Sequence, residues 1–507
     1  MNIQSNPTTF QEQKVSTSLK KKLRQIVWDE KLNNLPGILF LLAFSLAAGV
    51  ATSLYGLKAG LGILVVIFGA TSLYAIVAKP KFGIVFLLIL AIFVFSLIRL
   101  GLNVPWGTTI DVVETLLMLG FFISQKKNPN WKVFKGPIAT MILIWIFFNF
   151  IEVANPVAES RLAWVYTIRS VAIVLMMYFV FVYQINTIQF IRLILKLWLI
   201  LSLVGALYGF KQEFIGFSAS EDEWLHSDPA IADLLFISGH WRKFSIFSDP
   251  VSFSYHMVVS SLLCVGLMAG PFKLWKKLVL AFFALIFISA MLFSGTRGAY
   301  VLVPVGLAFF SLLKLSKQIA IIASIAFVFI LVLIFIPTSN PTLFRFQSAF
   351  KPSDDASFKV RAVNQKRIQP YILTHPIGGG LGAVGSWGIR FAPNSFLAKF
   401  PPDSGYVRVA VELGWIGLFI FCCLMFTILK VGINNYYQIK NPELKNYCLC
   451  MLLVMFAYNV GNYPQEALVQ FPANVYFSLV IALIGATKML DDREQAKIKK
   501  GKLTSAV

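Results

Sequence analysis

Residues 273–317 read KLWKKLVLAFFALIFISAMLFSGTRGAYVLVPVGLAFFSLLKLSK, and this stretch decides the fold class. It contains two apolar runs, 276–294 and 298–313, which are separated by a short polar turn and flanked by lysines. Apolar runs of about 20 residues are long enough to cross a lipid bilayer as helices. Lysines at the ends of such a hairpin mark the cytoplasmic side, so the polar turn is predicted to face outward.

The composition of the whole chain agrees with this hairpin. Hydrophobic residues make up 57% of the 507 residues, and charged residues make up only 13%. Soluble domains keep about a quarter of their residues charged, so we predict an all-α, polytopic integral membrane bundle of roughly 12–14 helices. The net charge of +22 does not indicate nucleic-acid binding, because the basic residues lie in short clusters between apolar runs.

The predicted spans alternate between the two sides of the membrane. They are 36–54, 60–78, 82–98, 109–123, 136–153, 162–183, 192–215, 250–270, 276–294, 298–313, 317–337, 405–429, 446–462 and 472–488. Residues 1–35 and 491–507 are predicted to be cytoplasmic tails, 36–337 to hold the first eleven spans, and 405–490 to hold the last three. Two long segments, 216–249 and 338–404, are therefore predicted to lie outside.

The second outer segment is strongly basic. Eight basic residues stand against three acidic ones in 338–404, which implies an anionic partner, either lipid head groups or a phosphorylated substrate. No metal or cofactor is predicted. The cysteines, which are Cys264, Cys422, Cys423, Cys448 and Cys450, lie in or beside apolar runs without metal-ligand spacing. The run Glu221-Asp222-Glu223 is a weak divalent-metal candidate, and such runs are more often solvated loops.

Three polar motifs stand at the predicted outer ends of spans. The first is Ser294–Tyr300, where the Arg297 guanidinium is suited to bind a phosphate through two N–H groups or, alternatively, snorkels to the interface. The second is Arg361–Gly385, a basic helical stretch that ends at His375-Pro376 and a glycine run. Its G-x-G-x-x-G match lacks the β-α-β context of a nucleotide site, so we predict a loop whose backbone either turns sharply or approaches a ligand closely.

The third motif begins at Asp403 and enters the twelfth span. Arg408 and Glu412 lie four residues apart on one helical face, either as functional groups or as a structural ion pair. Arg169 in the sixth span is another intramembrane cation, with Glu152 and Glu159 as candidate partners.

In this order, the motifs resemble the O-antigen ligase and O-antigen polymerase superfamily of bacterial membrane glycosyltransferases. The matching patterns are S-x-[ST]-R at Ser294–Arg297, an arginine (Arg361) upstream of H-P-[IL]-x-G-x-G at His375–Gly382, and a polar motif ending in E-x-G-x-[IL]-G at Asp403–Gly417. The resemblance implies transfer of a glycan from undecaprenyl pyrophosphate to an acceptor hydroxyl on the outer face of the bacterial plasma membrane. The acceptor is lipid A-core in ligases and another lipid-linked repeat in polymerases, and no metal or nucleotide takes part.

The resemblance also implies roles for individual residues. Arg297 and Arg361 would bind the pyrophosphate. Asp403 stands where relatives often carry the histidine that is read as the base, which leaves His240 and His375 as alternative bases. The expected substrate-binding residues are Arg367, His375, Arg408, Glu412, His240 and Arg169.

The sequence leaves ligase and polymerase open. A flippase or exporter of lipid-linked glycans is the alternative from another class, and it would require charges along a central cavity and repeated halves. A non-catalytic assembly partner is a third class. The ionisable residues instead gather at the predicted outer ends of the spans, which favours a transferase.

Overall fold

The computed structural model describes residues 34–55, 69–99, 106–237, 239–314, 331–338, 341–350, 356–469 and 471–504, together with positions 321, 324 and 328. The chain divides into two units, 1–75 and 76–507. In the first unit, α2 (Leu35–Tyr55) is a 21-residue apolar helix. Its sequence is apolar on all sides, which is typical of a membrane span.

The second unit is a bundle of long helices joined by short ones. Its helices are α4 (Pro80–Arg99), α5 (Trp106–Lys127), η2 (Trp131–Phe134), α6 (Pro137–Ile151), η3 (Glu152–Ala154), α7 (Arg161–Val171), η4 (Ile173–Met176), α8 (Met177–Gln184), α9 (Ile188–Phe214), α10 (Ala219–His226), α11 (Pro229–Leu235), α12 (Pro250–Met268), α13 (Leu274–Phe293), α14 (Arg297–Leu313), α16 (Pro341–Ser348), α17 (Ala356–Thr374), α18 (Gly385–Phe391), α19 (Gly405–Gln438), α20 (Pro442–Gly461) and α21 (Ala473–Thr504). Strands β1 (Phe236–Ile237) and β2 (His240–Trp241) form a two-stranded antiparallel pair.

The predicted fold class is confirmed. Within the described residues, eleven helices are long and apolar enough to cross a membrane, and α14 is a shorter apolar helix. Two of the predicted spans are described only in part. Residues 69–78 of the span 60–78 form a short apolar helix, and of the span 317–337 only positions 321, 324, 328 and 331–337 are described. Each of the other predicted spans coincides with a helix, or with the run α7–η4–α8 in the case of 162–183.

The centre of the bundle is formed by α12, α20 and α21, whose side chains are mostly buried. Small residues allow these helices to approach closely. A Cβ added to Gly266 on α12 would lie 2.7 Å from the Cys450 sulfur on α20. Cys450 therefore acts as a small packing residue, as the sequence predicts.

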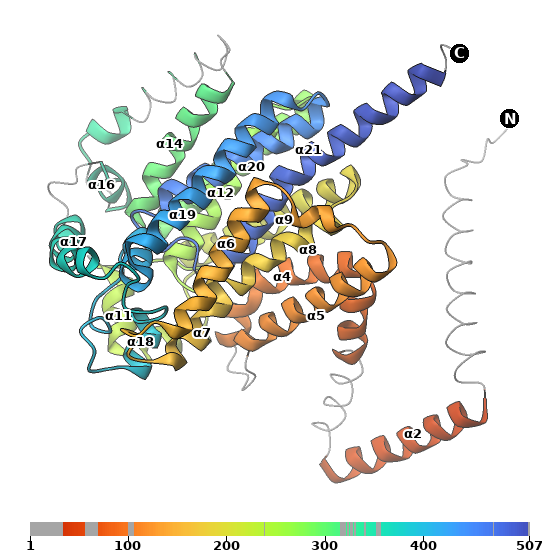
Figure 1. The fold of residues 1–507 in the computed structure, drawn as a ribbon. Helices are drawn as coiled ribbons and strands as arrows, with labels where there is room; N and C mark the ends of the chain where they lie inside the picture. The colour runs from red at the N-terminus through yellow and green to blue at the C-terminus, as the bar shows by residue number, and fades with distance from the viewer. Residues whose placement is uncertain are drawn as a thin grey trace, which may run out of the picture. The chain divides into compact units, whose positions relative to one another are not determined.

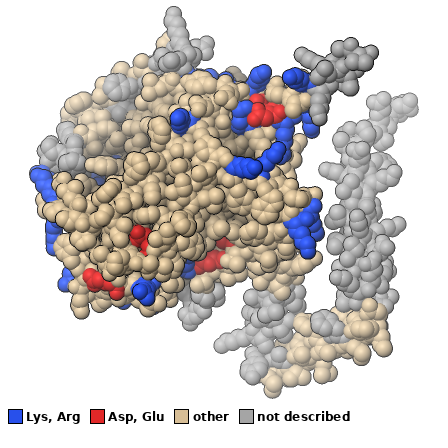
Figure 2. Space-filling model, viewed as in Figure 1, with Lys and Arg blue, Asp and Glu red and all other residues tan. Residues whose placement is uncertain are grey.

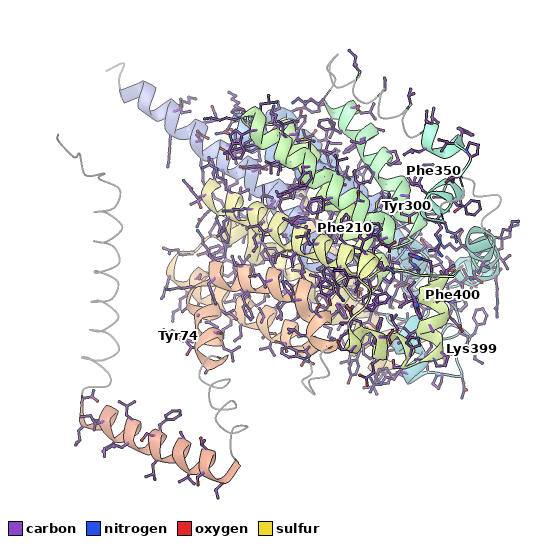
Figure 3. All side chains as sticks on the ribbon, turned by 180° about the vertical axis from the view of Figure 1, so that it is seen from behind. Tyr74, Phe210, Tyr300, Phe350, Lys399 and Phe400 are labelled. Atoms are coloured by element: carbon purple, nitrogen blue, oxygen red, sulfur yellow. The ribbon has the colours of Figure 1, made fainter. Side chains whose placement is uncertain are left out.

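Helices α11, α16, α17 and α18 lie at one end of this unit, and the last turns of α21 project from the other (Figure 1). The visible surface is largely uncharged, with most charged side chains near its two ends (Figure 2). Seen from behind, Tyr300, Phe350, Lys399 and Phe400 all lie at the end that carries α16, α17 and α18 (Figure 3). The outer ends predicted for the three motifs are therefore one shared end of the bundle.

Candidate functional site

The turn between α13 and α14 is a rigid hairpin. Gly295 adopts a positive φ of 62°, which favours glycine. The Thr296 amide donates to Ser294 Oγ at 3.1 Å, and the Tyr300 hydroxyl donates back to the Leu292 carbonyl at 2.9 Å. These bonds hold Arg297 at the first position of α14.

Arg242 docks the segment 216–249 onto this hairpin. Its guanidinium donates to the Ser294 carbonyl at 2.9 Å and to Thr296 Oγ1 at 3.0 Å. The residue is only 9% exposed. The neighbouring Lys243 amide donates to the Phe293 carbonyl at 3.1 Å. Two segments that are far apart in sequence therefore form one surface.

A third arginine reaches the hairpin from α16. Arg345 donates to the Ile237 carbonyl at 2.8 Å, and one of its guanidinium nitrogens lies 2.7 Å from where a Gly295 Cβ would stand. The Arg345 guanidinium can therefore approach the hairpin this closely only because Gly295 has no side chain. We call Arg242, Arg297 and Arg345 the arginine cluster.

The charges of the arginine cluster repel one another. The pKa of Arg242 is lowered to about 10, mainly by burial and also by the charges of Arg345 and Arg297, against the opposing pull of Asp249. Burial and the Arg297 charge also lower the pKa of Arg345. A pKa near 10 leaves Arg242 charged at neutral pH. The cluster therefore favours a polyanion, and guanidinium N–H groups match phosphate oxygens in geometry.

Arg361 on α17 faces the same neighbourhood. It interacts electrostatically with Tyr255, whose hydroxyl donates to the Gly461 carbonyl at 2.9 Å. The Tyr255 oxygen also lies 3.5 Å from where a Cβ on Gly298 would stand, one residue after Arg297. Tyr255 thus lies near Arg361 and near the backbone of the residue that follows Arg297.

Asp403 lies at the entrance of α19, beside the connection between α20 and α21. The Gly405 amide, two residues later, donates to the Asn462 carbonyl at 2.9 Å. Pro464 in the same connection lies 3.3 Å from the position of a Gly298 Cβ at the start of α14. These contacts connect the start of α19, two residues after Asp403, to the start of α14 through the connection between α20 and α21.

Arg408 and Glu412 form a buried ionic triad with Glu466. Arg408 Nε lies 3.2 Å from Glu412 Oε1, and Arg408 Nη1 lies 2.5 Å from Glu466 Oε2. The side chains are 12%, 3% and 17% exposed, in the order Arg408, Glu412, Glu466. The structural ion pair, one of the two interpretations of these residues, is therefore present and includes a third member. A cavity of about 60 Å³ borders it, lined by Trp145 and Phe421 among others.

The glycine run is a loop that docks on a break in α19. Gly414 interrupts this helix with φ 66° and ψ −174°. The loop fills the break, since the Gly379 amide donates to the Val411 carbonyl and the Gly380 amide to the Glu412 carbonyl, both at 2.9 Å. The prediction of a sharply turning loop is confirmed, and its close backbone approach is to α19.

A second cavity, of about 140 Å³, lies beside this loop. It is lined by Glu159, Tyr371 and Ser395 among others. Burial raises the pKa of Tyr371, and the charge of Glu159 adds to that shift. His375 stacks on the Tyr371 ring at 3.9 Å, and its Nδ1 lies 2.9 Å from the Tyr371 carbonyl oxygen. His375 Nδ1 also lies 2.9 Å from Thr374 Oγ1.

Three other predicted substrate-binding residues have protein partners. Arg169 pairs with Asp111 on α5, so the expectation of Glu152 or Glu159 as its partner is wrong. His240 Nε2 lies 3.4 Å from Glu213 Oε2. The Arg367 guanidinium lies over the Phe396 ring, 5.4 Å from its centre.

Glu221, the first residue of the acidic run at 221–223, has a structural role, whereas Asp222 and Glu223 are exposed. Glu221 accepts hydrogen bonds from the Gln212 side chain at 2.7 Å and the Ser218 amide at 2.8 Å, which close the first turn of α10. These bonds lower the pKa of Glu221 against the effect of its burial. Across the described parts of the chain, no three or more His, Cys, Asp or Glu residues are grouped so that they could hold a metal ion.

The sequence interpretation missed Arg242, Arg345 and Glu466. Arg242-Lys243 is a basic pair that ends an otherwise acidic outer segment, and this contrast was a usable signal. Arg345 and Glu466 carry no comparable signal, because each is recognisable only from its neighbours in space.

Residues 280–422 match the O-antigen ligase family. The match contains the Arg297 hairpin, the Arg345 helix, the glycine loop and the first half of α19, so the resemblance read from the three motifs is confirmed. No curated protein matches the chain.

Proposed function

From membership in the O-antigen ligase family, which residues 280–422 carry, we propose that this chain moves a glycan from undecaprenyl pyrophosphate to an acceptor hydroxyl at the outer face of the bacterial plasma membrane. The family and the apolar helices make it a multi-pass membrane enzyme of the glycosyltransferase type. The donor, the acceptor and the orientation belong to the proposal.

The arginine cluster is the observation that supports this function most directly. Three guanidinium groups from three separate segments gather at one hairpin, and Arg361 interacts with Tyr255, which lies near the start of α14. The leaving group in the proposed reaction is a lipid pyrophosphate, which needs several positive charges as its bond to the sugar breaks. Arginine side chains at this end of the bundle are suited to stabilise that charge.

The proposed step is a nucleophilic substitution at the anomeric carbon of the donor. The acceptor oxygen forms a bond to that carbon, and the bond between the carbon and the pyrophosphate oxygen breaks. The hydroxyl proton passes to a base, and undecaprenyl pyrophosphate leaves with the electron pair. Arg242, Arg297, Arg345 and Arg361 would stabilise the charge that develops on the leaving group.

Asp403 is the proposed base. Two structural roles for it, capping α19 and pairing with Arg408, are filled by other residues. Ser404 Oγ accepts from the Val407 amide, and Arg408 pairs with Glu412 and Glu466. His375 and His240 remain the alternatives.

Deletion of the gene, followed by analysis of surface polysaccharide and lipid-linked intermediates, tests the function. A ligase defect leaves finished polymer on its lipid carrier, whereas a polymerase defect leaves single repeats. Either result supports a transferase of this family. Accumulation of precursor on the cytoplasmic face would instead indicate a flippase and contradict the proposal. Ligase is the first choice because the matched family is the O-antigen ligase family.

The reaction is proposed to be independent of metal, because arginines take the place of a cation beside the pyrophosphate. Transfer by the purified enzyme should keep its rate in excess EDTA. Loss of activity that Mg²⁺ or Mn²⁺ restores would contradict this. The variant Asp222→Asn with Glu223→Gln would then show whether the exposed part of the acidic run binds the ion.

A further inference from the structure

A large groove lies at the other end of the bundle, between α9 and α13. Its volume is about 680 Å³, and α12 and α20 complete its wall. Leu199, Val279 and Phe283 contribute to its apolar lining. The groove opens to the surface, since Val279 is 41% exposed and Trp275 is 58% exposed.

The groove is far from the arginine cluster. It is lined by the first turns of α13, including Lys276, and α13 ends at Phe293 beside the Arg297 hairpin. At 1.5 Å per helical residue, the separation is roughly 25 Å. A ligand of this groove is therefore distinct from the donor proposed above.

The rim of the groove is basic. Arg192, Lys196 and Lys276 line it together with one carboxylate, Glu443. Glu443 is engaged by Arg192 through two short hydrogen bonds of 2.6 and 2.7 Å, and Tyr447 donates to it at 2.6 Å. The charges of Arg192 and Glu443 cancel, so Lys196 and Lys276 give the rim a net positive charge.

We propose that this groove binds an anionic phospholipid, with the phosphate at Lys196 and Lys276 and an acyl chain along Leu199, Val279 and Phe283. The proposal rests on a basic rim and an apolar trough in one groove. A free phosphate would use only the rim, and a neutral lipid would use only the trough. Trp275 at the rim is typical of side chains at the level of lipid head groups.

Lipid binding to the full-length protein in detergent tests this by native mass spectrometry. Phosphatidylglycerol and phosphatidylcholine with the same acyl chains are the probes. We expect wild type to bind phosphatidylglycerol more tightly than phosphatidylcholine. The double variant Lys196→Gln with Lys276→Gln should weaken phosphatidylglycerol binding on the order of 10–30-fold. Lys430→Gln removes an exposed lysine of α19 that does not line the groove, and it should leave binding unchanged.

A second variant tests the apolar part. Val279→Trp fills the trough and keeps both lysines, so it should also weaken phosphatidylglycerol binding. Equal binding of the two lipids by wild type, or unchanged binding by the double variant, would overturn the proposal. An equal loss of phosphatidylglycerol binding in Lys430→Gln would show that the binding depends on net charge and not on the groove. Inorganic phosphate that displaces the lipid at matched concentration would identify a simple anion site instead.

Discussion

Among single residues, Arg297 is the one on which the proposed chemistry depends most. Arg297→Ala should leave the protein inserted and lower transfer by about 10²–10³-fold, because it removes a donor from the leaving pyrophosphate. Arg297→Lys should restore only part of the rate, since an ammonium lacks the planar fork. Transfer per milligram of purified protein is the measurement. Near-normal activity of Arg297→Ala would show that this arginine only snorkels to the interface.

An isosteric substitution distinguishes a catalytic role of Asp403 from the structural roles of its neighbours. Asp403→Asn cannot take a proton, so transfer should fall by about 10²–10⁴-fold while donor binding survives. Asp403→His should retain some activity, because it restores the residue common at this place in the resembling family. Ser404→Ala is the matched control, since it removes the observed helix cap and should act through stability. An active Asp403→Asn variant would leave His375 and His240 as the next candidates.

The sequence singles out residues that are unusual in their own segment. Arg297 stands out because it follows an apolar span, and Arg408 and Glu412 stand out because they are charged within one. Arg345 is one of several basic residues in its segment, and only its approach to Gly295 distinguishes it. The position of Arg345 beside the hairpin depends on long-range contacts, which no local sequence pattern contains.

The break in α19 is the decisive feature at the scale of elements. Gly378 and Gly385 have nearly the same backbone angle φ, 72° and 73°. A Cβ on Gly378 would lie 2.5 Å from the Glu412 carbonyl oxygen, whereas a Cβ on Gly385 would meet nothing closer than Pro402 at 3.9 Å. Substitutions at these two positions therefore distinguish the cost of backbone strain from the cost of steric overlap.

Gly385→Ala should cost only the strain of a left-handed residue, about 1–2 kcal/mol. Gly378→Ala should add roughly 1–3 kcal/mol of overlap and displace the loop from α19. Thermal unfolding in detergent measures the difference, and transfer activity should fall only for Gly378→Ala. Equal effects of the two variants would mean that the loop can shift away from α19 without loss.

Hydropathy located the helices but not their interruptions. The positions of α12, α13 and α20 follow from apolar runs of membrane length. The end of α17 at Thr374, one residue before His375-Pro376, agrees with the effect of proline on the residue before it. The break at Gly414 was not predicted, because the glycine loop that fills it lies more than thirty residues earlier in the sequence.

For the whole molecule, orientation decides which leaflet the arginine cluster meets. The polar motifs converge at one end of the bundle, and the groove with Lys196 and Lys276 lies at the other. Clusters of lysine are typical of the cytoplasmic side, so the arginine cluster is expected to face outward. The structure gives the two ends, and an experiment must say which one is outside.

Two cysteine variants make that distinction. Lys399 is exposed at the end that carries α17 and α18, and Lys440 is exposed in the connection between α19 and α20 at the opposite end. A membrane-impermeant maleimide should label Lys399→Cys in cells with an intact inner membrane, and it should label Lys440→Cys only after permeabilisation. The parent protein controls for the native cysteines, which lie in α12, α19 and α20. The reverse pattern would place the arginine cluster on the cytoplasmic side, where a donor in the outer leaflet cannot reach it, and the proposed reaction would fall with the orientation.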